Sequence, residues 1–106
     1  SADDMALAAN TVAEMQGGVV LVDGGKVVAS IALPVVGLLS DMDAWSFARA
    51  RKDVLAQAAA MGCSVPEPFM FLSFITLAAI PAFAITDKGY VNCLTQQLMD
   101  PILSWK

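Results

Sequence analysis

Hydrophobic residues recur at helical spacing in the first part of the chain, over residues 3–16. The stripe that they form consists of Met5, Ala8, Val12 and Met15. This spacing places them on one narrow face of an amphipathic helix. Asp3 and Asp4 fall in the first turn, where carboxylates interact favourably with the positive end of the helix dipole. The glycine pair at 17–18 is expected to end this helix.

A β-branched segment follows, and its pattern predicts a β-hairpin. Residues 19–22 and 26–31 flank the turn residues Asp23, Gly24 and Gly25, and such a short connection is a strong hairpin signal. Residues 19–22 are apolar at every position. Both faces of the first strand should therefore be covered, one by helices of this chain and the other by something outside it.

The connection over residues 33–40 is unusually apolar for a surface loop. Pro34 ends the second strand, because proline has no N–H to donate to a strand partner. Either Asp41 or Asp43 is expected to cap a helix that runs to Met61. The inner face of this helix is expected to consist of Phe47, Ala48, Val54, Leu55 and Ala58.

The second half of the chain predicts a short helix and a second pair of strands. Ser64 and Glu67 have the spacing of a capping box, which predicts a short, nearly fully buried helix just after them. Pro81 marks its end or a turn. Residues 83–86 and 90–93 flank a tight turn and are expected to pair as strands.

These elements together predict an α+β fold in which a β-hairpin and short strands form a small sheet packed by about three helices. We expect one domain over residues 1–106. Its tail, residues 94–106, is weakly patterned, and Pro101 would cap any helix there.

The most apolar run, residues 69–84, is too short to span a bilayer. It holds 16 residues, whereas a spanning helix needs about 20. Pro81 interrupts the run, and its flanking charges, Glu67 on one side and Asp87 with Lys88 on the other, show no positive-inside bias. We therefore expect a core segment and no membrane partner.

The composition indicates more apolar surface than a small soluble domain usually has. Of its 106 residues, 58% are hydrophobic and 15% are charged, against about 25% charged in a typical soluble domain. A small domain needs much polar surface, so we expect a chain that associates with itself or is a fragment of a larger one. The net charge of −4 argues against a nucleic-acid partner. The acidic N-terminus does not resemble a secretory signal, so a cytoplasmic location is expected.

Candidate chemistry is sparse in this sequence. Histidine is absent, which excludes histidine-based zinc sites and Ser-His-Asp or Cys-His catalysis within the chain. Cys63 and Cys93 are expected to be buried reduced thiols, with a single disulfide as the alternative. Capping, dipole or turn roles account for a set of carboxylates: Asp3, Asp4, Asp23, Asp41, Asp43, Glu67 and Asp87. We therefore assign no catalytic residue and no metal ligand to the chain.

Two long blocks carry a recognisable order of motifs. Residues 17–41 contain a glycine-rich entry, a hairpin around an acidic turn with Gly and Lys, and a Leu-Pro-x-x-Gly-Leu-x-Ser-Asp loop. Residues 66–89 contain a Pro-Phe-Met-x-Leu-Ser-Phe stretch and a Thr-Asp-x-Gly close. In this order the chain resembles the C-terminal domain of bacterial adenine deaminases over about residues 3–93, with residues 94–106 unassigned. The departures from the family pattern are Glu67 for an aspartate, Ala78 for a proline and Ala84 for a basic residue.

The resemblance implies a structural and interface domain of a metal-dependent enzyme. Adenine deaminases hydrolyse adenine to hypoxanthine and ammonia. Their divalent metal, manganese or iron, would lie in a barrel domain that precedes Ser1, and this fragment would hold no cofactor. The implied partners are that barrel and further copies in a homo-oligomer. The alternative is a stand-alone small-molecule-binding or oligomerisation module with no catalysis.

One speculative site follows from the apolar loop. Ser40 and Asp41 end that loop, and we hypothesise that they lie near the substrate at the mouth of the barrel. The simpler interpretation is that Asp41 caps the following helix.

Overall fold

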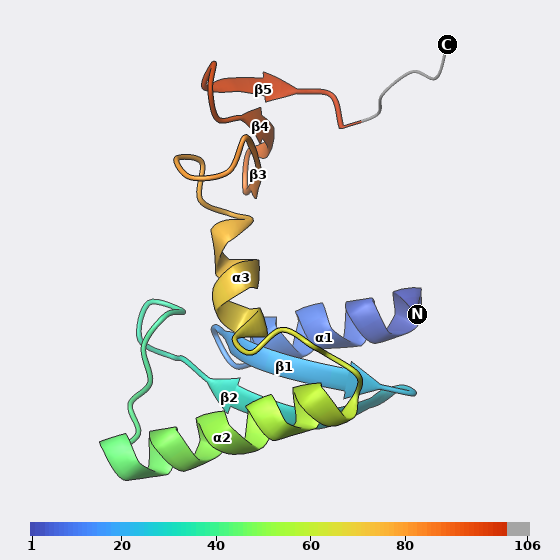
Figure 1. The fold of residues 1–106 in the computed structure, drawn as a ribbon, viewed down its shortest axis with the longest axis vertical. Coiled ribbons are helices and arrows are strands. Elements are labelled where there is room, and N and C mark those ends of the chain that lie inside the picture. The colour runs from blue at the N-terminus through green and yellow to red at the C-terminus, as the bar shows by residue number, and fades with distance from the viewer. Residues whose placement is uncertain (102–106) are drawn as a thin grey trace. The chain divides into compact units, whose positions relative to one another are not determined.

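The computed structural model describes residues 1–101, and within them it contains three helices and five strands (Figure 1). They divide into two units, residues 1–66 and residues 67 onward. The predicted α+β class is confirmed, with the strands distributed between two small antiparallel sheets. The single domain expected over residues 1–106 stays a prediction.

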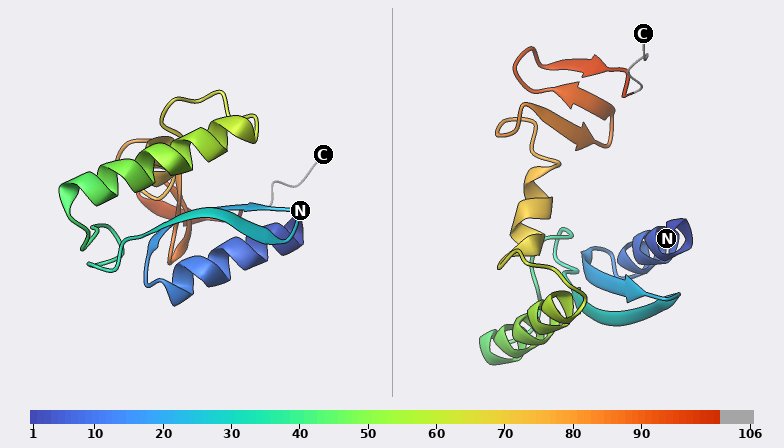
Figure 2. Two further views of the ribbon diagram at one scale, coloured as in Figure 1. Left: turned by 90° about the horizontal axis from the view of Figure 1, so that it is seen from below. Right: turned by 45° about the vertical axis from the view of Figure 1, so that its right-hand side comes forward.

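The first unit is a β-hairpin between two helices. Strands β1 (Gly18–Asp23) and β2 (Lys26–Ala32) pair antiparallel through a turn at Gly24 and Gly25, as predicted. Helix α1 (Ala2–Glu14) lies on one face of the hairpin and helix α2 (Ala44–Ala60) on the other (Figure 2, left). The expectation that one face awaits something outside the chain is wrong, because α2 packs mainly on β2 and reaches β1 as well.

The start of α1 is joined to the hairpin turn through Asp4. Ser1 and Asp4 form a capping box in which the Asp4 N–H donates to the Ser1 hydroxyl at 3.1 Å and the Ser1 backbone nitrogen donates to the Asp4 carboxylate at 3.4 Å. The Ser1 hydroxyl donates to the same carboxylate oxygen at 2.8 Å. The other carboxylate oxygen of Asp4 accepts from the Gly25 N–H at 2.7 Å. The Asp4 side chain therefore completes the capping box that Ser1 begins and also holds the turn between the two strands.

Helix α2 begins at Asp43, and not at Asp41. The Asp43 carboxylate accepts hydrogen bonds from the N–H groups of Trp45 and Ser46, each at 3.0 Å. Its inner face supplies Val54 and Ala58, which are buried with Ile31 of β2. The predicted inner position of Ala48 is wrong, since it is exposed. The half-buried and buried positions of α2 lie instead along a single stripe, which consists of Phe47, Ala50, Val54, Leu55 and Ala58.

The second unit contains α3 (Pro68–Phe74) and a three-stranded antiparallel sheet (Figure 2, right). Strands β3 (Phe83–Thr86) and β4 (Gly89–Asn92) form the predicted second hairpin, and its core residue is Ala84. Strand β5 (Gln97–Met99) pairs with β4. The sequence pattern of residues 94–106 is weak and did not predict β5, because three residues show too little alternation of apolar and polar side chains to be recognised.

Helix α3 is as short as predicted, but two other expectations for it are wrong. Its N-cap is Glu67, whose side chain makes no capping hydrogen bond, and no Ser64 capping box forms. Pro68 at the first helical position has no N–H that needs a partner. The helix is also not buried, since Phe71 is 63% exposed. Among residues 1–101, no helix is long and apolar enough to cross a membrane.

Candidate functional site

The apolar loop after β2 and the start of α2 line an open hollow, and the predicted site residue Ser40 is part of its wall. This cavity has a volume of about 400 Å³. Its lining is apolar apart from the Ser40 hydroxyl and consists of Leu33, Leu38, Leu39, Ser40, Met42, Ala44 and Phe47. An apolar hollow with one polar group is the usual composition of a binding surface in proteins.

The structure gives the two predicted site residues different surroundings. Ser40 lines the cavity, and its hydroxyl oxygen accepts a hydrogen bond from the Met42 N–H at 3.1 Å. Asp41 is exposed and does not line the cavity. Capping of α2, which the sequence offered as its simpler role, belongs to Asp43.

Backbone contacts hold the base of this loop in place. Gly17 and Gly37 approach so closely that a Cβ atom added at Gly17 would lie 2.3 Å from the Cα of Gly37. The Leu33 N–H donates to the Gly17 carbonyl oxygen at 3.0 Å, and Val35 and Leu39 bridge across the loop. The sequence indicated Gly17 only as the end of a helix, since nothing local reveals a partner twenty residues away.

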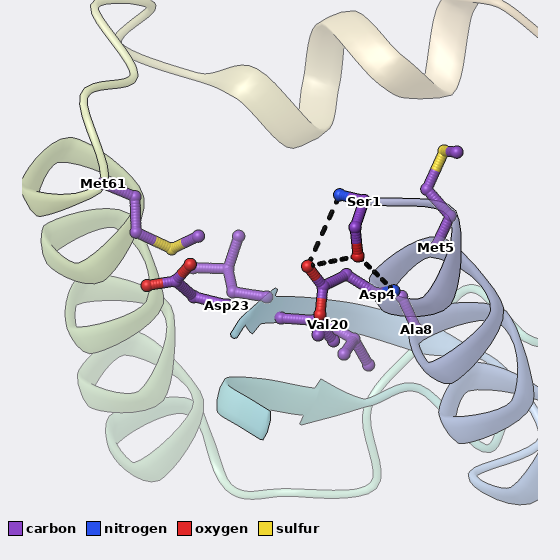
Figure 3. A pocket seen from close by; sticks show the side chains of 9 residues that line it. Ser1, Asp4, Met5, Ala8, Val20, Asp23 and Met61 are labelled. Carbon is purple, nitrogen blue, oxygen red and sulfur yellow. Dashed lines mark hydrogen bonds and ion pairs between the residues drawn. The ribbon is translucent and has the colours of Figure 1, made fainter. Parts of the chain in front are cut away.

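A second hollow, also about 400 Å³ in volume, lies beside the start of α1 (Figure 3). Asp4 lies on one side of it, bonded to Ser1, and Asp23 and Met61 lie on another. The Gly25 N–H, and after it the Ser1 hydroxyl, lower the pKa of Asp4 below its ordinary value of 3.8. A carboxylate stabilised in its charged form by local hydrogen bonds suits a cap, and it is a poor proton acceptor near neutral pH.

A third hollow, of about 440 Å³, lies in the second unit. Two of the polar side chains that line it, Thr86 and Gln96, are hydrogen-bonded to nearby backbone. The Thr86 hydroxyl accepts from the Lys88 N–H and donates to the Gly89 carbonyl oxygen, and the Gln96 amide donates to the carbonyl oxygens of Ala78 and Cys93. These groups stabilise the β3–β4 turn and the connection into β5.

The two cysteines lie in different units of the chain. Cys63 and Cys93 are both free thiols, and they are half-buried, which is less burial than the sequence predicted. Within residues 1–101, no three side chains of histidine, cysteine, aspartate or glutamate are grouped closely enough to share a metal ion.

Comparison with known proteins matches this chain along most of its length. The family model described as "Adenine deaminase C-terminal domain" matches residues 1–97. "Adenine deaminase 1" of Desulfotalea psychrophila is 41% identical over 103 residues, and "Adenine deaminase 1" of Latilactobacillus sakei is 40% identical over 102 residues. "Adenine deaminase" of Methylobacterium sp. is 43% identical over 89 residues.

These matches cover almost all of this chain but little of the relatives. The alignment takes in 97%, 96% and 84% of this chain, respectively. The chain spans 17% of the length of the first two relatives and 16% of the third. The predicted resemblance is confirmed, and residues 94–97, which it left unassigned, lie within the family match.

Proposed function

The chain belongs to the adenine deaminase C-terminal domain family, and on that premise we propose that it is a structural and interface module of such an enzyme. In this proposal the whole protein hydrolyses adenine to hypoxanthine and ammonia in the cytoplasm. The chemistry takes place in a barrel domain outside these residues. The observation that carries the proposal is a family match over residues 1–97 in a sequence without a single histidine.

The residues of this chain do not fit the divalent metal of the proposed enzyme. Manganese, iron and zinc in hydrolases are held mainly by histidine and carboxylate ligands. Here histidine is absent, and Asp4 and Asp43 are engaged in capping two helices. We therefore assign the metal to the catalytic domain, and no step of the reaction involves a metal held by this chain.

Equilibrium dialysis against Mn²⁺ tests whether the metal is bound outside this chain. We expect the full-length protein that carries this chain to retain metal in a whole-number ratio and the 106-residue chain to retain none. Stoichiometric, tight Mn²⁺ binding by the 106-residue chain would contradict the proposal, because it would place the metal on residues that lack suitable ligands.

A substrate-proximal role for Ser40 and Asp41 is the finer part of the proposal. Its support is that Ser40 places a hydroxyl in an otherwise apolar hollow at the foot of an exposed loop. In the full-length protein, Ser40→Ala and Asp41→Asn are expected to lower kcat/KM at least tenfold, which corresponds to about 1.4 kcal/mol, with little change in melting temperature.

Asp43→Ala is the matched control for that test. It lies two residues from Asp41 and caps α2, so it is expected to lower the melting temperature while leaving kcat/KM nearly unchanged. If Ser40→Ala and Asp41→Asn also leave kcat/KM unchanged, neither residue acts near the substrate. The role of the chain is then purely structural.

A further inference from the structure

Six large, exposed apolar side chains lie within residues 35–45, on the loop after β2 and the first turn of α2. We call them the apolar loop surface, which consists of Val35, Val36, Leu38, Leu39, Met42 and Trp45. Val36 and Trp45 are each 84% exposed, and Leu38 is 75% exposed. Scattered single apolar residues are normal on a protein surface, whereas several within one short segment are typical of an interaction site.

This surface is held by backbone contacts at its base and is strained at its tip. Val36 has a backbone φ of 57°, in the left-handed region that β-branched residues rarely adopt. The base beneath it is fixed by the Gly17–Gly37 approach and the Val35–Leu39 bridge. Strain of this kind persists where the surrounding structure enforces it and is concentrated at sites of function. An apolar loop that backbone contacts hold at its base, followed along the chain by the exposed Trp45, has the features of a preorganised binding anchor.

We propose that the apolar loop surface docks onto an apolar patch of the preceding, catalytic domain of the same polypeptide. This inference rests on the proposed function. More than four fifths of the length of the relatives lies outside their match to this chain, and the family is that of a C-terminal domain. A tethered domain is present at an effective concentration on the order of millimolar. It therefore occupies such a surface ahead of a second free copy.

Hydroxyl-radical footprinting tests the docking. Oxidation of Met42 and Trp45 is compared between the 106-residue chain and the full-length protein at several protein concentrations. We expect at least a fivefold slower oxidation of both side chains in the full-length protein, independent of concentration. Met5 on α1, which is 70% exposed, is the internal reference for general radical dose.

Matched substitutions then locate the contact. In the full-length protein, Leu38→Asp is expected to abolish the protection of Met42 and Trp45, because a charge is costly in an apolar interface. Met5→Asp, at a site of similar exposure outside the surface, should leave the protection in place. Equal oxidation in both proteins would overturn the proposal. So would protection that grows with concentration, which indicates a second copy, or protection already complete in the 106-residue chain.

The outcome is distinguishable from a failure of the proposed function. Adenine hydrolysis is measured on the same full-length preparation. Protection without adenine hydrolysis supports the docking and contradicts the assigned reaction. Hydrolysis without protection supports the reaction and overturns the docking.

Discussion

Replacing Gly17 by alanine tests how tightly the apolar loop is fixed to the rest of the first unit. Gly17 has a φ of 121°, and an added Cβ would lie 2.3 Å from the Gly37 Cα and 2.9 Å from its carbonyl carbon and oxygen. The disfavoured φ costs on the order of 1–3 kcal/mol. Forcing a methyl group against backbone that cannot rotate away adds about 1–3 kcal/mol. We therefore expect Gly17→Ala to lower the free energy of unfolding by about 4 kcal/mol.

Gly62→Ala separates the two contributions. Gly62 also has a positive φ, of 96°, but an added Cβ there would meet nothing within 4 Å. This variant should lose only the conformational part, about 2 kcal/mol. Urea unfolding of the two variants and the parent chain, followed by circular dichroism, measures the difference. Equal losses for Gly17→Ala and Gly62→Ala would refute the close approach of Gly17 to Gly37.

Two further predictions concern the loop tip and the helix caps. Val36→Gly should raise the free energy of unfolding of the 106-residue chain by up to about 1 kcal/mol, because it relieves the strained φ of 57°. In the full-length protein, urea unfolding should show that the same substitution lowers this free energy, because a docking side chain is lost. A rise in both proteins would contradict the docking. Hydrogen bonds from Gly25 to Asp4, and from Ser46 to Asp43, lower the pKa of each carboxyl below 3.8. The stabilisation from these two groups is therefore complete above pH 3.8 and is lost as the pH falls through their lower folded values. Urea midpoints measured between pH 6 and pH 2 should fall steeply below pH 4, and less steeply in Asp43→Asn; identical pH profiles would contradict the cap.

Local patterns predicted the elements whose stabilising contacts are themselves local. The stripe of α1 and the turn glycines of both hairpins lie within a few residues of what they determine, so periodicity and turn chemistry were sufficient. Asp41 and Asp43 could not be ranked as caps, because both precede the same helix and only the backbone geometry selects Asp43.

Features that depend on distant contacts were not predictable. The burial expected for α3 followed from its apolar composition, yet composition does not specify what covers a helix. The Gly17–Gly37 approach, the second face covered by α2, and strand β5 all depend on pairings between separated segments. In the candidate site, Ser40 was identified because it ends the loop, whereas the strained tip at Val36 has no sequence signal, since valine is a poor residue for a positive φ.

Ammonia release from adenine tests the central claim most directly. It is measured for the 106-residue chain and for the full-length protein that carries it, each supplied with Mn²⁺, Fe²⁺ or Zn²⁺. A hydrolase needs about three protein ligands for an activating metal. The sequence has no histidine, and the described residues 1–101 hold no group of three potential ligands. The account predicts turnover by the full-length protein and only the buffer rate for the chain alone. Metal-dependent turnover by the 106-residue chain, or its absence from the metal-loaded full-length protein, would contradict it.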